Sequence, residues 1–206
     1  MENIIPFLFQ IAILIMSVVV HEVAHGLTAY SLGDPTAKYE GRLTLNPVRH
    51  LDPFGSILVP ALTYYAGGII FGWAKPVPYN PYNLRDQRWG PALVAAAGPR
   101  SNLFLAIVFG IVIQVIGEPT TSSAAAVLQF SYMIVLVNVG LLIFNFVPIP
   151  PLDGSKVLFA LLPYKWRHIQ DILEQYGLFI LVIFLVYFSS ILGPIHRTLV
   201  SLLTGV

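Results

Sequence analysis

The chain has 206 residues, of which 56% are hydrophobic and only 10% are charged, and its mean hydropathy is +0.77. This is too few charged side chains for the surface of an ordinary soluble domain. The composition therefore predicts an integral membrane protein in contact with the lipid bilayer. The formal net charge of +1 offers no basic surface, which excludes nucleic acid as a partner. The chain contains no cysteine, so any zinc would have to be bound by His, Asp or Glu.

The first apolar run, residues 4–32, is long enough to cross a bilayer as a helix. It lacks the positively charged start and the cleavage site of a signal peptide, so we expect a retained transmembrane helix. Its second half carries His21, Glu22 and His25 in the pattern HExxH. Four residues advance an α-helix by about 400°, which places the two imidazoles one turn apart on one face, as two ligands of one metal ion require.

The surroundings of this motif decide how it is interpreted. HExxH also occurs by chance in soluble helices, where it is weak evidence for a metal. Within a membrane-length segment, however, ionisable side chains are costly to bury and usually mark a functional site. A metal ion with its water would compensate that cost, so we interpret the motif as part of a zinc site.

The apolar runs predict an all-α polytopic membrane protein, organised as one domain over residues 1–206. About four runs qualify as full spans, at residues 4–32, 91–117, 124–148 and 176–193. A fifth run, residues 54–72, is only marginally long and is interrupted by Pro60 and by Gly67 and Gly68. It either crosses the bilayer or dips in and returns.

The basic residues favour the second alternative. If residues 54–72 form a re-entrant segment, every Lys and Arg except Arg197 falls on one side of the membrane. The positive-inside rule then predicts an outside N-terminus and cytosolic loops at residues 33–90 and 149–175.

Residues 42–45 alternate polar and apolar side chains and are followed by Asn46 and Pro47. This pattern predicts a short membrane-associated β element, with a plain polar loop as the alternative. The edge of such a strand would accept an extended peptide by β-strand addition.

A hydrolytic zinc typically has three protein ligands, and Asp153 is the strongest candidate for the third. It directly follows the run at 124–148, after three prolines that forbid a continuing helix. Irregular backbone at membrane depth is tolerated only where it lines protein or a watery cavity, so Asp153 is expected at the mouth of such a cavity. The alternative is that Asp153 caps a short helix at residues 154–162.

Three motifs in this order resemble the site-2 protease family of intramembrane zinc metalloproteases. They are HExxH at residues 21–25, the run from Gly98 to Asn102, and the run from Asn145 to Gly154. The segment from Phe71 to Pro81 resembles the compact prokaryotic branch of that family, which has no appended domains. The resemblance covers residues 15–165.

The resemblance implies one zinc ion bound by His21, His25 and Asp153, with Glu22 as the catalytic residue. It also implies that Asn145 helps to hold the substrate backbone near the metal, with a hydrogen bond between helices as the alternative. The implied substrates are transmembrane proteins cleaved in or near their spans. The implied location is a prokaryotic cell membrane. The short distance in sequence from His25 to the basic loops predicts that the active site opens to the cytosolic side.

Two further asparagines are interpreted structurally: Asn102 as a polar link between spans, and Asn138 as packing. In the expected reaction Glu22 takes a proton from the attacking water and returns it to the leaving amine. Two rival classes stay open at this point. One is a transporter or scaffold that binds metal without catalysis, and the other is a zinc hydrolase acting on lipid-soluble substrates. No feature of the sequence indicates an oligomeric state.

Overall fold

The computed structural model describes residues 4–59, 62 and 75–205, and over these residues the fold is all-helical, without strands. Four long helices contain stretches long and apolar enough to cross a membrane: α1 (Ile4–Ser31), α4 (Gly90–Ile116), α5 (Ser122–Phe146) and α7 (Arg167–Thr204). The short elements are α2 (Thr36–Tyr39), η1 (Pro47–Arg49), η2 (Pro53–Leu58), η3 (Pro81–Asn83), α6 (Asp153–Leu161) and η4 (Tyr164–Trp166). The prediction of an integral membrane protein is confirmed.

The first three predicted spans agree with α1, α4 and α5 to within about two residues at each end. The fourth, predicted at 176–193, is too short, because α7 runs over 38 residues. Hydropathy detects only the apolar part of a helix. The polar first turns of α7 contain no helix breaker, and Pro194 lies inside the helix without ending it.

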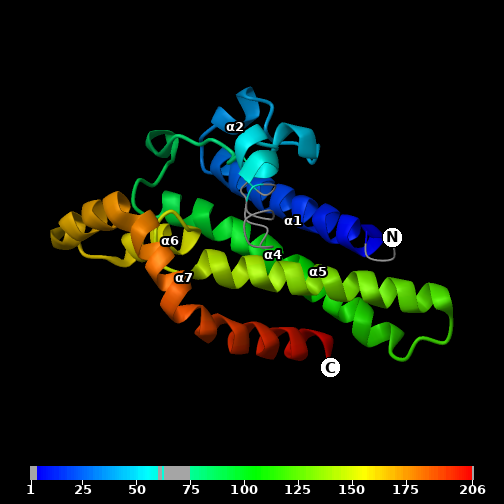
Figure 1. The fold of residues 1–206 in the computed structure, drawn as a ribbon. Coiled ribbons are helices and arrows are strands. Elements are labelled where there is room, and N and C mark those ends of the chain that lie inside the picture. The colour runs from blue at the N-terminus through cyan, green and yellow to red at the C-terminus, as the bar shows by residue number, and fades with distance from the viewer. Residues whose placement is uncertain (1–3, 60–61, 63–74, 206) are drawn as a thin grey trace.

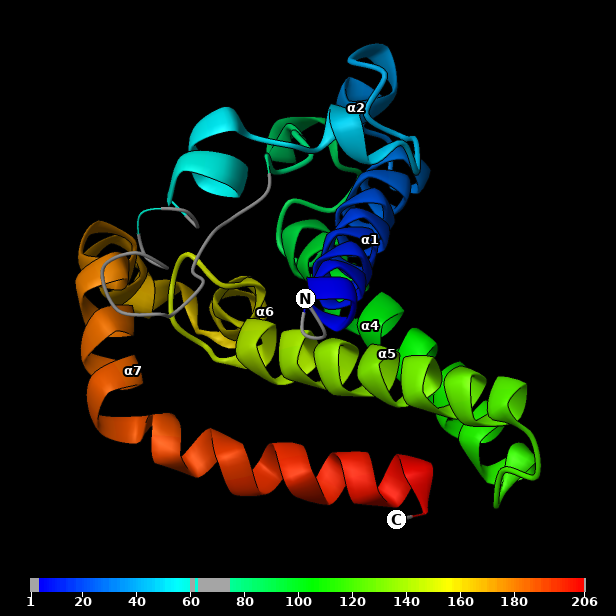
Figure 2. The same cartoon turned by 45° about the vertical axis from the view of Figure 1, so that its right-hand side comes forward.

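Helix α4 occupies the centre of the molecule and packs against α1, α5, α6 and α7 (Figures 1 and 2). Helix α7 is bent, and its C-terminal half runs back along α5 (Figure 2). One hydrophobic core joins the three helices α4, α5 and α7. Its buried members are Ala106, Ile113, Val135, Val139 and Val200.

Residues 42–45 do not form the predicted strand; their backbone is irregular. Side chains take the place of strand pairing here. The Arg42 guanidinium turns inward, and its Nη2 donates to the carbonyl oxygens of Lys75 (2.7 Å) and Pro76 (3.2 Å). The Thr44 carbonyl pairs with the His50 ring at 2.8 Å. With these groups engaged and no neighbouring strand among the described residues, the alternation of side chains does not produce a β element.

The predicted re-entrant segment at 54–72 lies mostly outside the described residues, which include its first turn, η2. The chain on either side of it is joined by direct hydrogen bonds. The backbone N–H of Lys75 donates to the His50 carbonyl at 2.8 Å. His50 and Lys75, which flank the segment, therefore lie next to each other.

Asp34, just after α1, is fully buried and holds two loops together. It accepts hydrogen bonds from the backbone and hydroxyl of Thr36, from the backbone of Asn80 (2.6 Å) and from the side chain of Asn83 (2.8 Å). Burial raises the pKa of Asp34, but these hydrogen bonds outweigh it and hold the pKa below the ordinary value of 3.8. The anchor fixes the segment after Lys75 against the end of α1.

We expect Asp34→Asn to destabilise the fold, because an amide would place a second donor against the donors of Asn80 or Asn83. The cost is about 1–3 kcal/mol. Since the folded pKa is depressed, the contribution of the carboxylate is complete above pH 3.8 and is lost as the pH falls below it toward the folded pKa. Thermal unfolding in detergent across the acid range measures both effects. The exposed Asp171→Asn is the matched control, and equal behaviour of the two variants would contradict the role of Asp34.

Candidate metal centre

The two histidines of the HExxH motif lie on one face of α1, as their spacing predicts. Their rings meet edge to face, with centroids 4.6 Å apart. The Nε2 atoms of His21 and His25 both point to one atom, Oδ2 of Asp153, at 3.1 and 3.3 Å. The three side chains are 8%, 12% and 21% exposed, so they meet in a nearly closed site.

The other ring nitrogen of each histidine is engaged by α4. His25 Nδ1 lies 2.7 Å from the carbonyl oxygen of Val94, and His21 Nδ1 lies 2.6 Å from Oδ1 of Asn102. A carbonyl oxygen can only accept, so each Nδ1 carries the proton and donates it. In the neutral rings both Nε2 atoms therefore present a lone pair to Asp153.

Asp153 is brought to this point by the junction between α5 and α6. Helix α5 ends at Phe146 before the prolines, and Asp153 is the first residue of α6. The N-cap of α6 is Leu152, and no side chain caps the helix, so Asp153 is not the predicted cap. A Cβ at Gly154 would lie 2.6 Å from the Phe146 carbonyl carbon, so only glycine permits this tight return beside Asp153.

The arrangement fits a divalent metal ion. Three electron pairs converge with no proton between them, and Asp153 Oδ2 is buried without a hydrogen-bond donor. Such a buried acceptor is costly unless a cation neutralises it. In a tetrahedral zinc site with bonds of about 2.0 Å, neighbouring ligand atoms are about 3.3 Å apart, which is close to the two observed N···O distances.

Gly98 leaves the space that an ion would need. It lies in the first third of α4, directly beside the two histidines. A Cβ at this position would be 2.5 Å from Nε2 of His21 and 2.5 Å from Nε2 of His25. A methyl group there would clash with the Nε2 atoms of both histidines. The sequence contained Gly98 in a recognised motif, but only the packing reveals this function.

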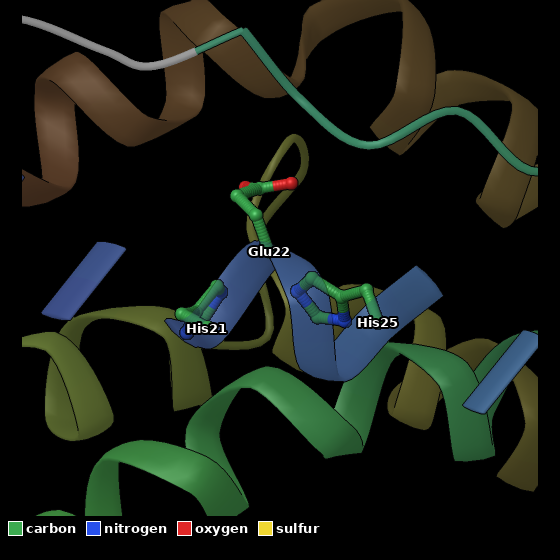
Figure 3. Close-up of side chains that lie close together, drawn as sticks. All are labelled: His21, Glu22 and His25. Atoms are coloured by element: carbon green, nitrogen blue, oxygen red, sulfur yellow. The ribbon is translucent and has the colours of Figure 1, made fainter. Parts of the chain in front are cut away.

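Glu22 extends on the other side of α1, away from α4 (Figure 3). Its Oε2 accepts a hydrogen bond from the backbone N–H of Val77 at 2.7 Å. A carboxylate oxygen of Glu22 and one nitrogen of each histidine all lie within 4.8 Å of one another. Glu22 is therefore oriented by the segment after Lys75, close to the ligand atoms but engaged separately from them.

The asparagines differ in how they relate to this centre. Asn145 donates to the Leu141 carbonyl of its own helix at 3.0 Å, so this hydrogen bond does not join two helices, as the alternative interpretation required. Asn102 does link spans, as predicted, and also contacts His21. Asn138 is more than packing, because it bonds to Asn102. No sequence signal could have identified the contributions of Val94 and Val77, which act through backbone groups.

We expect Gly98→Ala to abolish metal retention, because its methyl group would displace both Nε2 atoms from the point of convergence. The measurement is zinc per polypeptide in detergent-purified protein, by elemental analysis. Gly140→Ala is the control, since its methyl would meet only ordinary contacts at 3.8 Å and beyond. Stoichiometric zinc in Gly98→Ala would show that the centre lies elsewhere.

Comparisons with known proteins identify the family of the chain. Residues 112–188 match the model of peptidase family M50. The chain is 40% identical over 195 residues to "Putative zinc metalloprotease YwhC" of Bacillus subtilis, which covers 93% of this chain and 84% of the relative. It is 31% identical to "Putative zinc metalloprotease Rip2" of Mycolicibacterium smegmatis, over 87% of this chain and 67% of the relative. A Rip2 of Mycobacterium tuberculosis is also 31% identical, over the same shares.

No solved structure matches the chain significantly. The predicted family and the prediction of a metallopeptidase are nevertheless confirmed by these relatives. With its HExxH motif buried in an apolar helix, the chain belongs to peptidase family M50, the site-2 protease family of zinc metalloproteases.

Proposed function

We propose that the protein is an intramembrane endopeptidase that uses one zinc ion to hydrolyse peptide bonds in or near the transmembrane segments of other membrane proteins. One observation carries the proposal: His21, His25 and Asp153 converge on a buried point, with the Glu22 carboxylate close by. Residues 1–206 would form a single membrane domain, which would hold the reacting groups within its apolar part.

His21, His25 and Asp153 would hold the ion, and Glu22 would move the proton. A bound zinc ion polarises the scissile carbonyl and lowers the pKa of water to about 7. The Val77 N–H holds one oxygen of Glu22, and the other oxygen takes no part in the hydrogen bonds of the described residues. That second oxygen would accept the proton of the attacking water and return it to the leaving amine.

Asn145 is our candidate for holding the substrate. It lies in the last turn of α5, shortly before the chain reaches Asp153. Its amide nitrogen is used by Leu141, which leaves the side-chain oxygen to accept a backbone N–H from an extended substrate. A substrate helix must unwind locally to expose such a group, because its amides are otherwise hydrogen-bonded internally.

Glu22→Gln separates catalysis from metal binding. We expect zinc content to stay at one ion per chain, because Glu22 is not among the three converging ligands. Cleavage should fall by about 10²–10⁴-fold with loss of the general base. Reconstituted protein would be incubated with single-span peptides and, in parallel, with lipid-like esters, and the products analysed by mass spectrometry.

His21→Ala and Asp153→Ala are the matched variants for this experiment, and both should lose zinc and activity together. Full peptide cleavage by Glu22→Gln would refute the proposed base. Turnover of the esters but not of the peptides would instead favour a zinc hydrolase of another substrate class.

We also propose that residues 54–72 form a re-entrant segment and that the active site opens to the cytosol. The hydrogen bond from Lys75 to His50 supports this threading, because a segment that crossed the bilayer would separate its ends by about 30 Å. Arg42 and Lys75 lie together in this region, consistent with the positive-inside rule.

Topology reporters fused at Asp86 and at Glu118 test the threading. Asp86 precedes α4 and Glu118 lies in the loop after it, so a cytosolic signal is expected from the first position and an external signal from the second. Reporters on the same side would overturn the proposed topology, and an inverted pair would place the site on the external face.

A further inference from the structure

A chain of buried polar side chains runs from α5 through α4 to His21. Asn138 Nδ2 donates to the Ile134 carbonyl and to the Ser17 hydroxyl, both at 2.9 Å. Asn102 Nδ2 donates to Asn138 Oδ1 at 2.9 Å, and Asn102 Oδ1 meets His21 Nδ1 at 2.6 Å. Both asparagines are completely buried, and Ser17 is 3% exposed. These hydrogen-bonded side chains connect α1, α4 and α5 at the level of the metal centre.

The Ile134 carbonyl, at the α5 end of this row of hydrogen bonds, determines the direction of the bonds that follow it. The Ile134 carbonyl can only accept, so Asn138 must present its NH₂ group there and its oxygen to Asn102. Asn102 must then direct its NH₂ group toward Asn138 and its oxygen toward His21. Reversing Asn138 would leave two donors facing each other, and reversing Asn102 would leave two acceptors facing each other, at a cost of about 1–3 kcal/mol or more in this buried site.

The consequence reaches the histidine tautomer. Because Asn102 presents an acceptor, His21 carries its proton on Nδ1 and keeps the lone pair on Nε2, where Asp153 lies. The opposite tautomer would place a proton on Nε2, directly in the position of the metal bond. His25 reaches the same state through the Val94 carbonyl, which needs no side chain. His21 alone depends on a replaceable side chain for its tautomer.

We propose that Asn102 is a positioning residue of the metal centre, and that Asn138 acts through it by fixing its direction. This rests on the proposed zinc site. Partners of this kind fix the orientation and tautomer of a ligating histidine, and their loss typically lowers metal affinity 10–100-fold. The two asparagines thus couple the packing of three helices to the strength of zinc binding.

The test measures the zinc dissociation constant by chelator competition on full-length protein in detergent, together with the thermal stability of the metal-stripped form. Asn102→Leu removes the acceptor at similar volume, and we expect zinc binding to weaken 10–100-fold. Asn102→Asp also loses the donation to Asn138 but keeps an acceptor for His21. It should bind zinc within about threefold of wild type even though its stability falls.

Val139→Ala is the matched control. Val139 is fully buried and follows Asn138 in α5, but it takes no part in these side-chain hydrogen bonds. It should lower stability and leave zinc affinity unchanged. If the Leu and Asp variants weaken zinc equally, or if neither does, Asn102 is only a link between helices and the proposal is overturned. Should Asn102→Leu fail to fold, Asn138→Leu replaces it. This variant keeps Asn102 but no longer fixes the orientation of its amide. Unchanged zinc affinity in Asn138→Leu would overturn the proposal.

Failure of the zinc site itself would look different. In that case wild-type protein would bind no zinc, or His21→Ala and Asp153→Ala would bind as well as wild type. Tight wild-type binding that depends on His21 and Asp153 but not on Asn102 would refute the positioning role and leave the proposed function standing.

Discussion

With both rings neutral, two imidazole lone pairs and one carboxylate oxygen meet at a buried point, and the contacts around them hold each group in place. Left alone, such an arrangement is electrostatically unfavourable in an apolar interior, so it implies a cation. Each ligand is also held in one orientation: His21 by Asn102, His25 by the Val94 carbonyl, and Asp153 by the start of α6. The site is thus arranged for an ion in advance of binding.

Helix α4 contributes more to this arrangement than the helix that carries the HExxH motif. It contacts every other long helix and supplies both partners of the histidine Nδ1 atoms. Gly98 lets the backbone of α4 come close to the two histidines, and Pro99 follows it within the same turn of the helix. A glycine and a proline in a helix interior normally weaken it, but here the packing of the surrounding helices compensates.

The segment after Lys75 lies on the Glu22 side of α1. Arg42 holds the carbonyl oxygens of Lys75 and Pro76, and the next N–H, that of Val77, is directed at Glu22. The residues expected to act as ligands and the residue expected to act as base therefore face different parts of the protein. This division would let a metal be fixed by the helices while Glu22 is oriented by the segment after Lys75.

Sequence alone determined the membrane class, the first three spans, the family and the pair of imidazoles, because all of these follow from local composition or from spacing within one helix. It also singled out Asp153, since three prolines force the chain out of a helix just before it. The length of α7, the absence of a strand at residues 42–45, the space beside Gly98 and the direction of Asn102 were decided only by tertiary structure. Each depends on backbone groups or on packing contacts between segments distant in the chain. Every residue has a backbone carbonyl, so the sequence cannot show that the one of Ile134 directs a hydrogen bond.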